Sequence, residues 1–367
     1  MDLGVSRVLV VNAGSSSLKL RLLGGDDTVE QAADVEAGPD GVAGDDLTAL
    51  LDGWATPDAV GHRVVHGGTR FTRPTVIDAQ VRHALEELGS LAPLHQPKSL
   101  AGLDAVSRLL PDVPAVACFD TAFHATIPDA AATYAVPAQW RERYAIRRYG
   151  FHGLSHGYCA GRVADLTGRT DQRVVTCHLG AGASLAAVVD GRSVDTTMGF
   201  TPLEGLVMAT RSGSVDPGLV LWLEEHEGLA PHEIATALES RSGLSALAGT
   251  ADMRAIVAAV ARDEPAATLA LEVYLHRLVG GIASMAAAAG GLDVLAFTGG
   301  VGERAPLVRR RAAERLAFLG VDVDEARNDT ADGDTDIGAA GAPVASFVVA
   351  AREDLAIAAG TRAALVG

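Results

Sequence analysis

An apolar run that enters a glycine-rich turn and leaves it as a second apolar run occurs twice in this chain. The first example covers residues 8–23 with its turn at 12–19, and the second covers residues 174–189 with its turn at 178–184. Short apolar runs joined by glycine are typical of β-hairpins. Glycine lets the backbone approach a ligand closely, and consecutive N–H groups and hydroxyls at such a tip can bind phosphate. The repetition therefore predicts two related halves with a nucleotide held between them.

The remaining chain alternates strand-like and helical stretches, which predicts an α/β protein. A strand over residues 115–119 ends at Asp120, and a strand over 294–297 opens into a glycine-rich segment. Ligands in open α/β sheets tend to lie at such strand ends. Helices are expected near Leu100–Leu110, which the following Pro111 would end, and around residues 216–226, 266–290 and 353–364. Residues 24–53 have little periodicity and are expected to form irregular surface structure.

Length and charge narrow the class of protein. The chain has 367 residues, of which 48% are hydrophobic, so two domains are expected. A formal charge of −16 argues against a nucleic-acid or anionic-membrane partner. The three cysteines have no CxxC pairing, which argues against disulfides and a zinc site and favours a reducing cytoplasm. We expect no signal sequence, and the uncharged run at residues 278–292 is shorter than the ~20 residues of a spanning helix.

Charged and imidazole side chains stand beside glycines at separated points of the chain: Arg63, Asp120, His152, His178, Arg211 and Glu353. Phosphoryl transfer needs such a set, because its barrier falls mainly through positioning and charge neutralisation. Taken singly, each residue is more often structural. A different pattern, Gly300-x-Gly302-x-x-Ala305 followed by Asp322 and Asp324, fits a dinucleotide site and leaves a nicotinamide-dependent dehydrogenase open. No Walker P-loop is present, and no segment suggests an actin-like or chaperone-like ATPase.

Eight blocks of the sequence together resemble the acetate kinases, the acetokinase family, within the superfamily of acetate and sugar kinases, actin and heat-shock ATPases. They keep the family's order over nearly the whole chain: VNAGSSSLK (11–19), GHRVVHGG (61–68), LAPLHQP (91–97), FDTAFHATIP (119–128), RRYGFHGLSH (147–156), HLGAGAS (178–184), SVDTTMGFTPLEGLVMATRSG (193–213) and FTGGVGER (297–304). The resemblance implies two related actin-like (ribonuclease H-like) α/β domains around a central cleft, and a homodimer. The N-terminal domain would comprise residues 1–124 plus a returning C-terminal helix, 354–367. Residues 125–353 would form the C-terminal domain with the nucleotide site.

The resemblance also assigns roles. Asn12 and Glu353 would hold Mg²⁺, with Mn²⁺ as an alternative, and Ser15, Ser17 and Lys19 would face the phosphates of ATP. A second phosphate cradle would comprise His178, Leu179, Gly180, Ala181 and Gly182. The adenosine pocket would comprise Asp252, Met253, Arg254, Gly300, Val301, Gly302, Glu303 and Arg304. The catalytic residues would be Asp120, His152 and Arg211. The acid would be bound by Arg63 and by an apolar methyl pocket of Val65, Leu94, Phe151 and Pro202.

The implied reaction is the reversible phosphorylation of acetate to acetyl phosphate by ATP. A carboxylic acid is ionised at pH 7, so no strong base is needed, and Asp120 is better assigned to orienting Mg²⁺ or an arginine. Arg63→Ala or Arg211→Ala is expected to lower turnover on the order of 10³-fold and to leave the fold intact. Propionate or butyrate, or another phosphoryl donor, stay open. Ala181, Arg304 and Arg352 each replace an asparagine of the family pattern, and the two arginines could alter donor preference.

Overall fold

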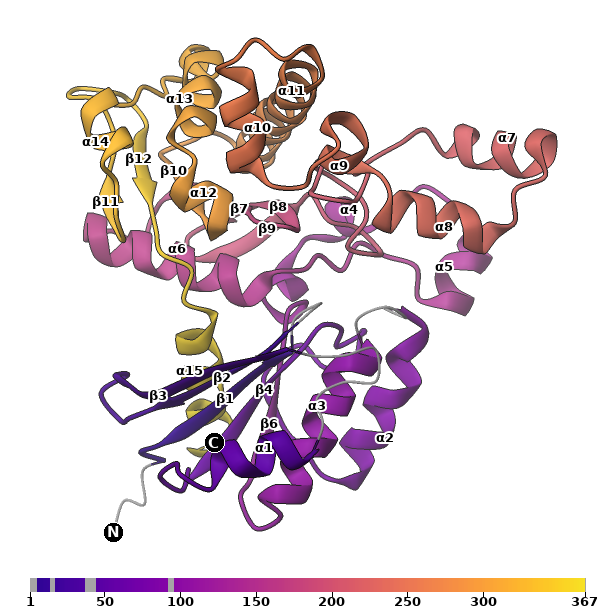
Figure 1. Cartoon of the computed structure of the whole chain (residues 1–367), viewed down its shortest axis with the longest axis vertical. Coiled ribbons are helices and arrows are strands. Elements are labelled where there is room, and N and C mark those ends of the chain that lie inside the picture. The colour runs from indigo at the N-terminus through magenta and orange to yellow at the C-terminus, as the bar shows by residue number, and fades with distance from the viewer. Residues whose placement is uncertain (1–4, 14–16, 37–43, 92–95, 367) are drawn as a thin grey trace. The chain divides into compact units, whose positions relative to one another are not determined.

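The computed structural model describes residues 5–13, 17–36, 44–91 and 96–366. The chain divides into two compact units, of which unit 1 comprises residues 1–125 and 352–367 and unit 2 comprises residues 126–351. Each unit contains one mixed sheet of six strands (Figure 1). The predicted α/β class is therefore confirmed.

Unit 1 is built on a sheet whose strand order is β3-β2-β1-β4-β6-β5. Its strands are β1 (Val8–Ala13), β2 (Ser17–Leu23), β3 (Val29–Glu36), β4 (Ala59–Val64), β5 (Thr75–Val76) and β6 (Ala115–Phe119). β1 and β2 pair antiparallel as the predicted first hairpin, while β1, β4 and β6 run parallel. Parallel strands bring their carboxyl ends to one edge, so Arg63 near the end of β4 and Asp120 just after β6 lie at the same edge.

Helices cover both faces of this sheet. They are α1 (Gly44–Leu51), α2 (Ala79–Glu87), α3 (Gln96–Leu109) and α15 (Glu353–Val366), with a 3₁₀ turn, η1 (Leu88–Leu91). In Figure 1, α1–α3 lie on one face and α15 lies on the other. Successive strand residues point to opposite faces. Gly61 of β4 accordingly faces α15, where a Cβ would overlap Thr361 and Ile357, and the buried His62 faces away from it, toward the charge of Asp104 on α3.

Unit 2 repeats the strand plan of unit 1. Its strands are β7 (Arg173–Leu179), β8 (Ala183–Val189), β9 (Arg192–Thr196), β10 (Val294–Thr298), β11 (Thr335–Asp336) and β12 (Ala345–Val348). The order β9-β8-β7-β10-β12-β11 matches β3-β2-β1-β4-β6-β5 position by position, with the same parallel and antiparallel pairings. The β7–β8 hairpin thus occupies the place of the β1–β2 hairpin, so the two glycine-rich tips are topologically equivalent.

The helices of unit 2 are α4 (Asp129–Ala132), α5 (Ala138–Tyr144), α6 (Gly153–Thr167), α7 (Pro217–Glu227), α8 (Pro231–Ser240), α9 (Gly243–Ala248), α10 (Met253–Val260), α11 (Pro265–Ala288), α12 (Gly299–Arg304), α13 (Pro306–Arg315) and α14 (Glu325–Asp329), with 3₁₀ turns η2 (Ala122–Thr126), which enters the unit, and η3 (Ala317–Leu319). The longest, α11, packs on β7, β8 and β9 and buries Leu271, Leu275, Leu278 and Ile282. This spacing of three to four residues is that of one helical face. The helix expected around residues 266–290 is therefore confirmed as α11.

The expectation for residues 24–53 was wrong in part. Residues 29–36 form β3 and residues 44–51 form α1. β3 is an edge strand whose residues alternate between half-buried and exposed, so it lacks the apolar run by which central strands are recognised. One apolar stretch, residues 243–260, is long and apolar enough to cross a membrane, but it is divided into α9 and α10 by a break at Gly249–Asp252. It is therefore not one continuous helix.

Candidate active site

Arg63 and Asp120 form a buried ion pair at the sheet edge of unit 1. The Arg63 Nη2 and Asp120 Oδ2 atoms are 2.6 Å apart, and Arg63 Nε donates to both Asp120 oxygens at 3.0 and 3.1 Å. The Asp120 side chain is 2% exposed. Burial raises the pKa of Asp120, and Arg63 opposes that rise; burial also acts to lower the pKa of Arg63, but Asp120 and Glu353 outweigh it and raise that pKa. Asp120 thus fixes the guanidinium in one orientation.

Asn12 extends this pair toward the start of α15. Its Oδ1 accepts a hydrogen bond from Arg63 Nη1 at 3.2 Å, and its Nδ2 donates to Glu353 Oε2 at 2.9 Å. The result is a continuous chain of contacts, Asp120–Arg63–Asn12–Glu353, which we call the Arg63 chain. Its members come from β1, β4, the end of β6 and α15. Four of the sequence-predicted residues are therefore brought together in unit 1.

The Arg63 chain has the donor chemistry that Mg²⁺ prefers. Carboxylate and amide oxygens are hard ligands, and Mg²⁺ in phosphoryl-transfer sites commonly takes one or two carboxylates and completes its shell with water and phosphate oxygens. Among the described residues, no group of three His, Cys, Asp or Glu side chains is placed to hold a metal ion. A Mg²⁺ ion held by Glu353 and Asn12 would thus need further oxygens from water and nucleotide. The residues fit that kind of site.

Histidines predicted from the sequence meet in unit 2. His152 and His178 stack with ring centroids 4.2 Å apart. Ser184 Oγ lies 2.8 Å from both His152 Nδ1 and His156 Nε2, and His156 Nδ1 lies 2.7 Å from Thr176 Oγ1. His152 itself has a left-handed backbone, φ 56°, at the start of α6. Such a conformation is costly for a side chain other than glycine, which indicates that the surrounding contacts hold the imidazole in place.

Gly182 lets His152 and Arg211 approach the second hairpin tip. A Cβ on Gly182 would lie 3.2 Å from His152 Cε1 and Nε2 and 3.5 Å from Arg211 Nη1. Arg211 Nη1 also donates to the carbonyl of Pro202 at 3.0 Å. His152, Gly182, Arg211 and Pro202 are therefore neighbours within unit 2, as the predicted roles require.

The second phosphate cradle adjoins the glycine-rich helix α12. The β7–β8 tip is closed by a hydrogen bond from Gly180 N to Gly182 O at 2.9 Å. Gly299, the first residue of α12, has φ +79°, and a Cβ there would lie 2.9 Å from the Leu179 carbonyl oxygen. Only glycine permits that approach. Two of the predicted nucleotide segments, residues 178–182 and 300–304, thus adjoin each other.

The structure leaves other assignments as predictions. Asp252 caps α10 and pairs with Arg254 at 3.1 Å on the surface, while Met253 is buried. Lys19 is exposed on β2, where it pairs in register with Asn12. Val65 and Phe151 are buried, as methyl-pocket residues would be. Ser15, Leu94 and the side chain of Ser17 lie outside the described part of the chain.

Comparison with known proteins identifies the family. The model of the acetokinase family matches residues 46–359. The chain belongs to the acetokinase family. It is 48% identical over 304 residues to an acetate kinase of Trichormus variabilis, covering 82% of this chain and 75% of that protein. Among solved structures, a propionate kinase from Francisella tularensis superposes with TM-score 0.91 at 35% identity, covering 98% and 99% of the two chains. Porphyromonas gingivalis acetate kinase gives 0.89 at 36% identity, covering 98% and 100%.

Membership in the acetokinase family excludes one alternative left open by the sequence, a nicotinamide-dependent dehydrogenase. The Gly300-x-Gly302 pattern lies on the six-residue helix α12 and belongs to an acetokinase fold, so the dehydrogenase reading is set aside. The departures from the family pattern are placed as follows. Ala181 is exposed at the cradle tip, Arg304 is exposed on α12, and Arg352 pairs with Asp354 at 2.9 Å.

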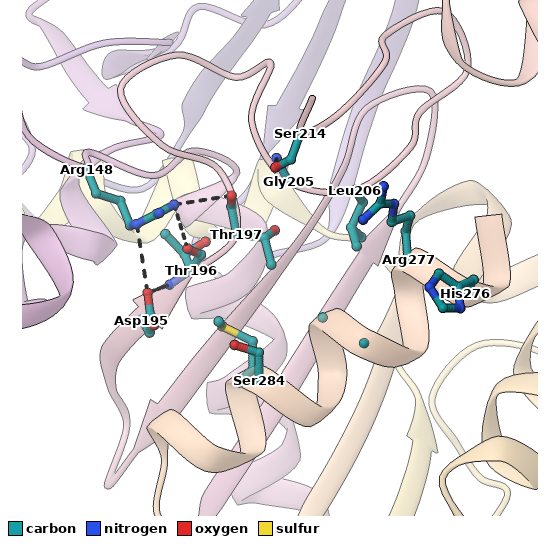
Figure 2. Close-up of a pocket in the computed structure, with 13 residues that line it drawn as sticks. Arg148, Asp195, Thr196, Thr197, Gly205, Leu206, Ser214, His276, Arg277 and Ser284 are labelled. Carbon is teal, nitrogen blue, oxygen red and sulfur yellow. Dashed lines mark hydrogen bonds and ion pairs between the residues drawn. The ribbon is translucent and has the colours of Figure 1, made fainter. Parts of the chain in front are cut away.

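Sequence reasoning assigned no role to two arginines that organise segments of the candidate site. Arg309 is 1% exposed, and its Nη1 donates to the carbonyls of Gly302 and Glu303 at 2.8 Å, which fixes the end of α12. Burial lowers the pKa of Arg309 to about 10, so it stays charged at neutral pH. Arg148 lies in a quoted motif but was assigned no role. It forms part of a pocket of about 460 Å³ in unit 2, which Figure 2 shows between the loop after β9 and α11.

Proposed function

We propose that this enzyme transfers the γ-phosphoryl group of ATP directly to acetate, giving acetyl phosphate and ADP in a reversible reaction that needs Mg²⁺. Family membership and a 48%-identical acetate kinase support the activity. The observation that carries the residue assignment is the Arg63 chain, in which one guanidinium is held by a buried carboxylate and an amide.

The proposed chemistry rests on offsetting repulsion between anions. Acetate is already ionised at neutral pH, so no proton need be removed from it. A carboxylate must instead approach a polyphosphate, in a protein with a formal charge of −16. Arg63 and Arg211 would neutralise charge on the acid and the transferring group, and His152 would donate to the same group. Asp120 holds Arg63 in orientation and removes no proton.

Nucleotide and metal binding follow from the remaining predicted residues. Ser15, Ser17, Lys19 and the cradle 178–182 would contact phosphates, and residues 252–254 and 300–304 would form the adenosine pocket. Bound Mg²⁺, held by Asn12 and Glu353, would neutralise charge on the phosphates. Arg304 and Arg352 stand where the family pattern has asparagine, so ATP, GTP and pyrophosphate should be compared as donors. An ordinary preference for ATP would argue against any role of these arginines in donor choice.

Propionate is the alternative acid. Val65, Phe151 and Pro202, with Leu94, would form the pocket for the alkyl group, and one methylene in such a pocket changes preference only ~10–200-fold. One of the similar structures is described as a propionate kinase and another as an acetate kinase. Proteins described as acetate kinase and as propionate kinase therefore share this fold, so the fold alone does not decide between the two acids.

We also propose a cytoplasmic homodimer. Helix α7 has no buried residue, although it is rich in apolar side chains, and its Leu219, Leu221 and Trp222 are 45–56% exposed. A group of exposed large apolar side chains on one helix is typical of a protein interface. The three cysteines are buried free thiols, which is usual in a reducing compartment.

Trapping of acyl phosphate tests the central proposal. Purified enzyme would be incubated with ATP, Mg²⁺ and hydroxylamine, and with formate, acetate, propionate or butyrate in separate reactions. Hydroxamate should form with acetate and should not form when EDTA removes the metal. If no hydroxamate forms with any of the four acids, the proposed function is wrong.

A further inference from the structure

The segment of residues 196–206 begins at the last residue of β9 and is held in large part by hydrogen bonds to side chains. It carries Pro202, one wall of the proposed acyl pocket. The carbonyls of Thr196, Thr197 and Met198 all accept hydrogen bonds from Nη1 of Arg148, at 3.1, 3.2 and 3.0 Å. Figure 2 shows Arg148, which precedes α6 in the same chain, beside Thr196 and Thr197 of this segment. One guanidinium therefore fixes the first turn of the loop.

The end of the same loop is tied to the same arginine. Arg148 Nη2 donates to Glu204 Oε1 at 2.8 Å, and Glu204 Oε2 accepts from the hydroxyl of Tyr134. The Tyr134 oxygen in turn accepts from Phe200 N at 3.0 Å. The guanidinium also lies over the Tyr134 ring, 5.6 Å from its centroid. Arg148 thus contacts the start of the loop and Glu204 near its end. Tyr134 contacts Glu204 and, through Phe200, the middle of the loop.

Gly199 packs directly against two of these three side chains. A Cβ on Gly199 would overlap the Glu204 carboxylate and the Tyr134 hydroxyl, so glycine is needed there. Burial, followed by the hydrogen bond to Glu204, raises the pKa of Tyr134, which keeps its hydroxyl protonated as a donor.

The cluster connects two walls of the proposed pocket. Arg148 precedes Phe151 by three residues, and the N–H groups of Tyr149 and Gly150 donate to the Gly199 carbonyl at 3.1 and 3.3 Å. Arg211 holds the Pro202 carbonyl at 3.0 Å. The segment that carries Phe151 is thereby fastened to the loop that carries Pro202. A shift of one would change its spacing from the other.

We infer that Tyr134, Arg148 and Glu204 are positioning residues that set acyl-chain selectivity by fixing the loop of Pro202 relative to the segment of Phe151. The inference rests on the proposed acid-kinase function. Selectivity between acids that differ by one methylene requires pocket walls that do not yield, because an apolar pocket gains little energy per methylene. Sites that are held within about 0.5 Å by packed neighbours meet that requirement.

Three conservative variants test the inference. Glu204→Gln removes the charge but keeps the shape, and Tyr134→Phe removes only the hydroxyl. Arg148→Lys replaces a planar fork, whose Nη1 serves the three carbonyls and whose Nη2 serves Glu204, by a single ammonium that cannot serve both sides at once. The control is Arg169→Ala, which breaks an exposed pair with Asp171 in the same unit. For each protein, kcat and KM would be measured for acetate, propionate and ATP, with a thermal melt to establish folding.

We expect the ratio of kcat/KM for acetate and propionate to move toward one by about three- to tenfold in the three variants, through changes in KM for the acids. KM for ATP should change less than about twofold, and the control should match wild type. A structural role alone would lower the melting temperature and leave the ratio unchanged, which would overturn the inference, as would a wild-type ratio already near one.

The two possible failures are distinguishable. A wild-type enzyme that phosphorylates none of the acids contradicts the proposed function, while an active wild type with unaltered selectivity in the variants contradicts only the inference. If Arg148→Lys does not fold, Tyr134→Phe decides, because its ring still lies under the guanidinium. An equal rise of KM for ATP and for the acids would also count against a specific role.

Discussion

Replacing Arg63 would affect the stability of the protein as well as its activity, because its partner Asp120 is buried. Removing its side chain would leave Asp120 buried without a counter-charge, which typically costs about 3–5 kcal/mol of stability. The sequence-based expectation that Arg63→Ala leaves the fold intact is therefore revised. Arg63→Lys keeps the charge and loses the two-pronged geometry. We expect its turnover to fall on the order of 10²-fold with a small change in unfolding free energy.

Initial rates of hydroxamate formation and urea unfolding would be measured on the same preparations of Arg63→Lys and Arg63→Ala. The alanine variant should be both slow and destabilised. Turnover of the lysine variant within about threefold of wild type would show that Arg63 acts only as a charge.

Burial of His62 predicts that the stability of the folded protein depends on pH. Among the described residues, it is one of the buried side chains whose ring nitrogens have no hydrogen-bond partner, and burial lowers its pKa to about 4, against the opposing charge of Asp104. The folded state thus keeps His62 neutral while the unfolded chain takes up a proton below pH ~6.5. Stability from this group is complete above that pH and falls by about 1.4 kcal/mol per pH unit toward pH 4.

Urea unfolding at several pH values between 7.5 and 4.5 checks this, with His62→Leu as the comparison. The variant should show a shallower decline, although His66, whose pKa burial also lowers to about 4, still contributes. Parallel declines in the two proteins would rule out His62 as a source of the pH dependence.

Single residues were predictable where they belong to a motif. Asn12, Arg63, Asp120 and Glu353 were named from short blocks, and the structure places them in contact. Tyr134 and Glu204 were assigned no role, although Glu204 lies within the block 193–213, because neither was expected to contact substrate, nucleotide or metal. Their contact with each other and with Arg148 became visible only in the structure.

At the scale of elements, the β7–β8 tip depends on the absence of a side chain at Gly182. Gly182→Ala places a methyl carbon 3.2 Å from the His152 ring and 3.5 Å from Arg211. One of these groups must shift by a few tenths of an ångström, and displacements of that order at a reacting centre are costly. We expect turnover to fall at least about tenfold with the fold retained.

Gly161→Ala is the matched control, because Gly161 lies within α6 and a Cβ there would meet nothing within 4 Å. That variant should keep full activity and gain about 0.5–1 kcal/mol from helix propensity. Equal activity of the two variants would mean that the tip tolerates a methyl group.

Elements were predictable in proportion to how fully they are buried. The central strands β1, β6, β7 and β10 have continuous apolar runs and were recognised from them. β3 was missed, since an edge strand with one solvated face carries little apolar signal. The identical order of the two sheets could not be read from the sequence beyond the repeated hairpins, because strand neighbours are set by contacts distant along the chain.

For the whole molecule, the exposed apolar side of α7 predicts association of two chains. The double variant Leu221→Glu with Trp222→Glu keeps residues compatible with a helix and adds charge to that side. Light scattering after gel filtration should give a dimer for wild type and a monomer, or a concentration-dependent mixture, for the variant.

Phe318→Glu supplies the control, since Phe318 is 72% exposed in unit 2 but lies on η3 and not on α7. It should remain a dimer. A monomeric wild type at micromolar concentration would exclude the homodimer, and dissociation of the control would move the interface away from α7.

The packing of α15 on β1, β4 and β6 has a consequence for the order of synthesis. Unit 2 is one continuous segment, residues 126–351, and can fold as it leaves the ribosome. Unit 1 begins first but needs Ile357 and Thr361 against Gly61 to cover its sheet. One face of its sheet therefore stays uncovered until the 226 residues of unit 2 and then α15 have been translated. The first-made half of the protein is the last to be completed, and Glu353 reaches Asn12 only then.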